Sequence, residues 1–104
     1  MKLARVTLFA RNMATMTAFY RDVLGLPVKS EEEGWVEFDG FALHRGAPKP
    51  GSTKLAFASK DVAKTREELV ARGATMGKVK DLGSLVLCDG QDSEGNLFQI
   101  SNRA

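Results

Sequence analysis

The stretch FYRDVLGLPV, residues 19–28, has the features of a helix that ends and a strand that begins. Gly25 stands where a helix end needs a left-handed residue, and Pro27 prevents the helix from continuing. Before it, apolar residues at positions 16, 19, 20, 23 and 24 have the spacing of a helix with one buried face. Asn12 can cap the start of this helix. We therefore predict a helix between Asn12 and Gly25, followed by a strand from Val28 to Ser30.

A strand is predicted before this helix and a hairpin after it. In LARVTLFA, residues 3–10, alternate side chains face opposite sides of a sheet, so Arg5, Thr7 and Phe9 share one face. The segments WVEF (35–38) and FALHR (41–45) flank Asp39-Gly40, a dipeptide typical of tight hairpin turns. Residues 31–34, three glutamates and a glycine, are predicted to form a solvated turn.

The pattern then begins again after a proline-containing linker at residues 46–51. A strand is predicted at 54–59 and a second helix after Asp61, with Gly73 beyond its end and with apolar positions at Val62, Leu69 and Val70. Further strands are predicted near 75–78, at 84–88 and at 97–101, with a turn at 91–96. Phe9-Ala10 matches Phe57-Ala58, and Gly25 matches Gly73 at the same separation.

This internal repeat predicts an α+β fold made of two βαβββ modules in one domain, 1–104. Module one would span 1–47 and module two 51–104. We expect the two modules to form a U-shaped mixed sheet with a concave trough and with the helices on the outer face. The trough would collect side chains from both first strands: Arg5, Thr7, Phe9, Lys54, Ala56 and Ala58.

Charge and cysteine content exclude several classes of function. The net charge is +2 and the basic residues are interspersed with acidic ones, so neither a nucleic-acid nor a membrane partner is indicated. Cys88 is the only cysteine, which excludes an intrachain disulfide and a cysteine-based zinc site and favours a buried, inert thiol. With no signal-peptide pattern after Met1, we expect a complete cytoplasmic protein, and its small size favours a homodimer.

Three motifs together resemble the vicinal oxygen chelate superfamily, which includes glyoxalase I, bleomycin-resistance proteins and extradiol dioxygenases. They are FYRDVLGL in the first helix, WVEFDGFALH in the hairpin and DSEGNLFQI near the C-terminus. The resemblance implies paired βαβββ modules and frequently a dimer. It also implies metal ligands (His, Glu or Gln) on the first and last strands of each module. Those positions hold Arg5, Ala42, Lys54 and Gln99.

Of these four residues, only Gln99 offers a plausible metal donor, so we expect no metal and no cofactor. His44 and Glu37 could share a strand face with Ala42, which makes them candidates for acid–base catalysis or for metal binding; the alternative is that both are ordinary surface or packing residues. Arg5 and Lys54 favour an anionic ligand, unless their long side chains carry the charges into solvent. Trp35 could stack on a planar ligand or could be core.

The sequence therefore predicts a metal-free binding protein that holds a small organic molecule, anionic or aromatic, in the trough. Sequestration by bleomycin-resistance proteins is a precedent within the resembling family. The predicted ligand-binding residues are Arg5, Thr7, Phe9, Trp35, Ala42, His44, Lys54 and Gln99. One alternative is a metal-dependent lyase, isomerase or dioxygenase that uses a non-standard ligand set. A second alternative is a protein-interaction or regulatory subunit, for which an exposed apolar trough would be the signature.

Overall fold

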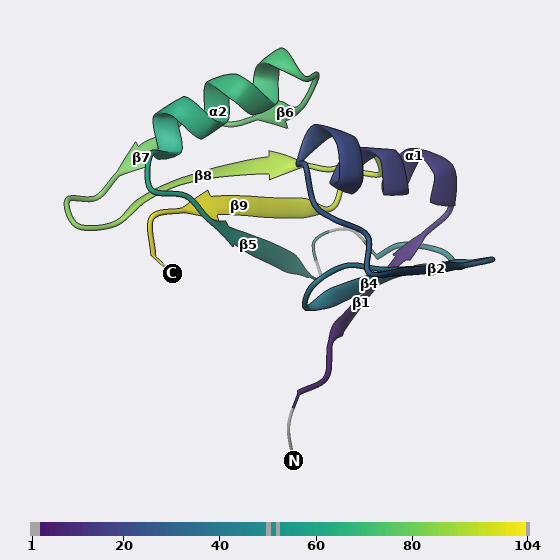
Figure 1. Ribbon diagram of the computed structural model, residues 1–104. Helices are drawn as coiled ribbons and strands as arrows, with labels where there is room; N and C mark the ends of the chain where they lie inside the picture. The colour runs from purple at the N-terminus through teal and green to yellow at the C-terminus, as the bar shows by residue number, and fades with distance from the viewer. Residues whose placement is uncertain (1–2, 50, 52, 104) are drawn as a thin grey trace. The chain divides into compact units, whose positions relative to one another are not determined.

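The computed structural model describes residues 3–49, 51 and 53–103. The chain divides between residues 49 and 50 into two compact units, each with one helical segment lying over one small sheet (Figure 1). We call the described residues up to 49 module one and those from 51 module two. In this part of the chain no helix has the length and apolar character needed to cross a bilayer.

Module one has the predicted βαβββ order. Its elements are β1 (Val6–Ala10), α1 (Met13–Ala18), the π-helical turn η1 (Phe19–Val23), β2 (Ser30–Glu32), β3 (Trp35–Glu37) and β4 (Phe41–Arg45). The sheet order is β1-β4-β3-β2, with β1 parallel to β4 and the other pairs antiparallel. The open α+β architecture of the module is therefore the one that the repeat predicts.

The helix of module one begins and ends as the opening motif predicts. The Asn12 side chain accepts a hydrogen bond from the Thr15 amide at 3.1 Å, which satisfies one of the free amides of the first turn. Gly25 has φ +74°, a left-handed conformation that favours glycine. The last turn is π-helical, with the Leu24 amide donating to the Phe19 carbonyl at 3.0 Å. That detail is not visible in the 3.6-residue spacing of the apolar positions.

The core of module one lies between this helix and the sheet. Tyr20 is fully buried, and its ring centroid lies 5.2 Å from that of Phe41 and 6.1 Å from that of Phe38. Phe38 and Phe41 stack on each other at 5.0 Å across the hairpin turn. Offset and edge-to-face aromatic pairs of this kind contribute about 0.5–1.5 kcal/mol each beyond their buried area. The paired aromatics of the opening motif thus anchor the helix to the hairpin.

One predicted turn of module one is wrong. Glu31 and Glu32 belong to β2, because they pair antiparallel with Val36 and Trp35 of β3. The strand begins at Ser30 instead of Val28, and the turn is confined to Glu33 and Gly34. The run of three glutamates suggests a solvated loop, but a charged edge strand is equally solvated and is protected from pairing with another chain.

Module two repeats the order and adds a short strand. Its elements are β5 (Lys54–Ala58), α2 (Val62–Ala71), β6 (Thr75–Met76), β7 (Lys80–Asp81), β8 (Val86–Gln91) and β9 (Leu97–Ser101). The sheet order is β5-β9-β8-β6, and β7 pairs with β8. As predicted, Asp61 caps α2 by accepting from the Lys64 amide at 3.1 Å, and Gly73 follows its end with φ +96°. Figure 1 shows α2 lying over the β8–β9 part of this sheet.

Three predictions for module two need correction. Val70 is 44% exposed, whereas Val62 and Leu69 are the residues that α2 buries. Strand β8 runs from Val86 to Gln91 instead of ending at Cys88, and β7 was not predicted at all. The sequence match of Phe9 with Phe57 also fails in the sheets. Phe9 is 46% exposed, whereas Phe57 lies on the helix side, 6.3 Å from the ring of Phe98.

Candidate functional site

The sheet of module one has one face covered by α1 and η1 and one face free of them. Strand register places Phe9 opposite His44, and His44 opposite Trp35. It also places Ala42 between Thr7 and Glu37. Because side chains alternate along a strand, these residues share the face away from the helix. We call this the open face of module one: Thr7, Phe9, Trp35, Glu37, Ala42 and His44, with Arg5 directly before β1.

Three rings form a continuous row across this open face. Phe9 meets His44 edge to face at a centroid distance of 5.7 Å, and His44 meets Trp35 edge to face at 5.9 Å. The Arg5 guanidinium carbon lies 5.8 Å from the Trp35 ring, within the range of a cation–π contact. We call Phe9, His44 and Trp35 the aromatic row. Ala42, two residues before His44 on the same face of β4, has only a methyl side chain and is fully buried.

A carboxylate balances the positive charge beside the aromatic row. Glu37 Oε2 lies 3.7 Å from Arg5 Nε and 3.9 Å from Lys29 Nζ. The Glu37 side chain is 23% exposed, and both cations are more exposed, so each pair contributes little to stability. The main effect is local charge balance. Glu37 is therefore paired with two cations, which makes it a weaker candidate for a general base.

Module two carries a comparable arrangement on the face away from α2. Register aligns Ala56, Gln99 and Asp89 across β5, β9 and β8. The Gln99 side-chain amide donates to Asp89 Oδ1 at 3.0 Å, and Lys54 Nζ lies 3.3 Å from Asp89 Oδ2. Burial on its own would raise the pKa of Asp89, but the hydrogen bonds from Gln99 and Lys54, with the charge of Lys80, outweigh it, so the pKa lies below its ordinary value.

A pocket of about 300 Å³ opens beside Asp89. It lies at the β6–β8–β9 edge of the sheet, and its walls are Thr75, Met76, Gly77, Asp89, Gly90, Gln91 and Leu97. Gly90 lets two side chains pack directly against the backbone of β8, since a Cβ at this position would come within 2.5 Å of Met76 Sδ and 2.8 Å of Phe98 Cζ.

The positions at which the resemblance implies metal ligands do not fit a divalent ion. Arg5 and Lys54 are cations, each beside a carboxylate, and Ala42 has no donor atom. Gln99 already donates its amide to Asp89, and one neutral oxygen does not hold a divalent ion. In residues 3–49, 51 and 53–103, no group of three or more His, Cys, Asp or Glu side chains is placed to hold one either. The donor chemistry therefore argues against chelation at these positions.

Two residues that shape these faces were not among the predicted site residues. Asp89 lies outside the predicted strand, which ends at Cys88; extending that strand by one residue places Asp89 in β8, where it pairs with Gln99. Lys29 gives no periodic signal, because it lies in the irregular segment before β2. Asp92, in contrast, has the turn role predicted for it, accepting from the Glu94 and Asn96 amides at 2.9 Å each.

Cys88 is the buried thiol that the sequence predicts. It is fully inaccessible, and its sulfur donates to the Gly77 carbonyl at 3.2 Å. Burial raises the pKa of the Cys88 thiol, and nearby Arg66 opposes this only in part. A thiol in this environment is a poor nucleophile. Among the described residues, this removes Cys88 from the candidates for covalent catalysis.

Several known proteins share this architecture. A crystal structure of a protein of unknown function from Agrobacterium tumefaciens str. C58 superposes with a TM-score of 0.84 at 20% identity, covering 97% of this chain and 93% of that one. A lactoylglutathione lyase from Agrobacterium tumefaciens matches at 0.78, with 18% identity and 96% and 92% coverage. TnmS3, an antibiotic binding protein from Streptomyces sp. CB03234, matches at 0.77, with 18% identity and 96% coverage of both chains.

Sequence comparison leads to the same family. No protein with a curated description matches this chain significantly. Residues 5–101, however, match the family described as glyoxalase-like domain, so the match takes in both modules and nearly the whole chain. Together with the βαβββ order, this shows that the chain belongs to the glyoxalase-like domain family, within the vicinal oxygen chelate superfamily.

Proposed function

We propose that this chain binds a small, flat organic molecule on the open face of module one without the help of a metal ion. The observation that carries the proposal is the aromatic row, Phe9, His44 and Trp35, which lies on the sheet face that α1 leaves uncovered. Phe9 is 46% exposed, although burying a side chain of this size is worth about 1.5–3 kcal/mol. A planar ligand that covers it recovers part of that free energy.

The charge pattern favours an aromatic ligand over a strongly anionic one. Arg5 is matched by Glu37, and Lys54 by Asp89, so neither cation offers an unshared positive charge. Lys29 leaves a small positive excess near Glu37, which suits a neutral ligand or one with a single negative substituent. Thr7 is exposed and would border the ligand on the same face, whereas Ala42 is fully buried and would not contact it. We propose that Lys54 and Gln99 offer polar contacts to a ligand on the open face of module two.

A binding role has a precedent among the proteins that share this fold. TnmS3 is described as an antibiotic binding protein, and it shares the fold over nearly all of both chains. Fold similarity alone does not carry chemistry, so the proposal rests on the ring geometry and the metal-incompatible positions. We further propose that the protein works as a cytoplasmic homodimer. A chain of 104 residues leaves much of its surface wet, and the single thiol is free. Light scattering in solution tests the dimer.

Trp35 is the only tryptophan, so its fluorescence reports on the site itself. Titration with naphthol should quench this fluorescence saturably and raise the melting temperature, because a ligand that binds only the native state must stabilise it. Cyclohexanol, of similar polarity but not planar, should do neither. A wider panel of planar aromatic molecules extends the test. If none of them changes either the fluorescence or the melting temperature, the open face of module one is not a binding site.

A further inference from the structure

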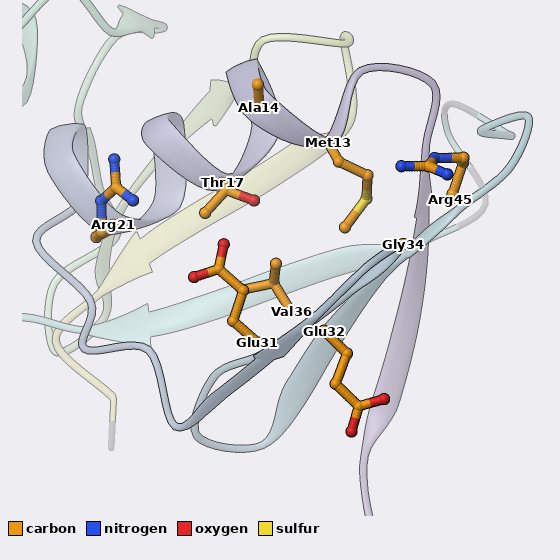
Figure 2. A pocket seen from close by; sticks show the side chains of 9 residues that line it. All are labelled: Met13, Ala14, Thr17, Arg21, Glu31, Glu32, Gly34, Val36 and Arg45. Carbon is orange, nitrogen blue, oxygen red and sulfur yellow. The ribbon is translucent and has the colours of Figure 1, made fainter.

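Module one has a cavity on the opposite side of its sheet from the aromatic row. This pocket has a volume of about 440 Å³ and lies between helix α1 and the β2–β3 hairpin. Figure 2 shows the helix forming one wall and the hairpin the other, with the side chains of Met13, Thr17 and Glu31 directed into the space between them. The volume falls within the range of small-molecule sites in proteins. None of the proposed ligand-binding residues on the open face lines it.

The inner wall of this helix–hairpin pocket is largely apolar. Val36 lies on the helix side of β3 and is 3% exposed, and Thr17 on α1 is 5% exposed. Met13 is half-buried, and in Figure 2 its side chain extends from the start of the helix into the space above the hairpin. An unbranched thioether adapts readily to the shape of an apolar guest. The pocket can therefore take the apolar body of a small molecule.

One carboxylate faces this apolar wall. Glu31 pairs with Val36 in the strand register and so shares the helix side of the sheet, whereas its neighbour Glu32 pairs with Trp35 and faces the other side. Figure 2 agrees: the Glu31 side chain points toward the helix and that of Glu32 points away from it. Glu32 also lines the pocket, but its carboxylate points away from the helix, so alternation along β2 leaves the Glu31 carboxylate as the one that faces α1.

The two arginines at the rim are already matched by other carboxylates. Arg21 donates twice to Asp22, from Nε at 2.8 Å and from Nη2 at 2.9 Å, and Arg45 Nη1 lies 3.8 Å from Glu33 Oε1. Within the described part of the chain, Glu31 forms no ion pair with either of them. Arg21 lies close enough for the charge of Glu31 to help raise the pKa of its guanidinium, so this carboxylate is shared in part. Glu31 is exposed, and a cationic guest there gains the modest attraction of a solvated ion pair.

We propose that the helix–hairpin pocket binds a small amphipathic organic cation, with its ammonium group on Glu31 and its apolar body against Met13, Thr17 and Val36. Phenethylamine is a suitable probe, and its neutral and anionic counterparts phenylethanol and phenylpropionate are matched controls for shape. Calorimetry and amide chemical shifts measure binding in the full-length protein. The amine should bind, with amide shifts centred on α1 and β2, and it should bind about threefold more tightly than phenylethanol, the ratio expected for one ion pair with an exposed carboxylate.

Adjacent glutamates supply the matched variants. Glu31→Gln should weaken amine binding about threefold and leave phenylethanol unaffected. Glu32→Gln removes the same charge from a lining residue whose side chain points away from the helix, and it should weaken amine binding less than Glu31→Gln does. Ala14→Phe should block both probes by filling the pocket from an exposed helix position that tolerates the change. Equal losses for the two glutamine variants would overturn the proposal, as would the absence of a preference for the amine or self-association of the protein through this surface.

Discussion

The Nε atom of Arg5 lies 3.7 Å from the Oε2 atom of Glu37. Arg5 stands where metal-using members of the superfamily carry their first ligand, so a cation matched by a carboxylate of the sheet replaces the donor. Module two repeats the arrangement with Lys54 and Asp89 at 3.3 Å. In both modules the positive charge beside the face away from the helix is carried by a side chain, Arg5 in module one and Lys54 in module two. This makes ring contacts and shape, instead of chelation, the natural source of affinity.

Trp35→Ala tests the aromatic row. The variant should bind naphthol about tenfold more weakly by calorimetry, because it loses ring contacts worth about 1–1.5 kcal/mol. Its fold should persist, since Trp35 is only partly buried. Phe38→Ala is the contrasting variant: Phe38 is fully buried, and its loss should cost about 3–5 kcal/mol of unfolding free energy. Unchanged naphthol affinity in the Trp35 variant would remove this residue from the site.

Glu37→Gln tests the charge balance on the open face. Without the carboxylate, Arg5 and Lys29 lose their shared partner, so naphthoate should bind more tightly, with a steeper dependence on salt, while naphthol should not change. Stability should change by less than about 1 kcal/mol, because the pairs are partly solvated. Glu67→Gln on α2 removes the same charge from an exposed position and serves as the control. A gain for naphthoate in both variants would indicate only a general effect of net charge.

Asp89 should make stability depend on acid pH. Its pKa in the folded protein lies below the ordinary value of about 3.9, since the bonds from Gln99 and Lys54 outweigh the effect of burial. The unfolded chain therefore binds more protons in this range, and the contribution of Asp89 is present above about pH 4 and is lost as the pH falls through the folded pKa. Urea unfolding from pH 7 to pH 2 should show a smaller loss of stability for Asp89→Asn. Parallel curves for the variant and the parent would contradict this assignment.

Cys88 should be unreactive until the protein unfolds. The thiol is buried and its pKa is raised by that burial, so an aromatic disulfide reagent should label it slowly in native buffer and rapidly in concentrated urea. Rapid stoichiometric labelling of the native protein would show that β8 opens readily and would return Cys88 to the list of candidate nucleophiles.

The sequence predicts the fold well where a single local signal decides the structure. Gly25 and Gly73 end helices with positive φ, and Asn12 and Asp61 cap helices through their side chains, as their residue types indicate. Short strands are harder to predict. The strand predicted near 75–78 is present but contains only Thr75–Met76. Lys80–Asp81 was not predicted, because two residues are too few for alternation to appear and only pairing with β8 makes them a strand.

The sheet face on which the candidate residues lie is predicted better than the partners of its cations. Alternation along 3–10 and the hairpin is enough to place Arg5, Phe9 and His44 on one side of module one. The partners of the cations could not be predicted, because Glu37 and Asp89 reach Arg5 and Lys54 from other strands, through a register that only the folded sheet defines. The helix–hairpin pocket was missed for the same reason, since assigning Glu31 to a turn concealed the face that it occupies.

Metal titration of the purified protein tests the central claim most directly. The account predicts that Zn²⁺, Ni²⁺, Mn²⁺ and Fe²⁺ neither copurify stoichiometrically nor raise the melting temperature, because Arg5, Ala42, Lys54 and Gln99 offer no adequate set of donors. A bound ion in a ratio of one per chain that raises the melting temperature, and that is lost in Gln99→Ala or His44→Ala, would contradict it.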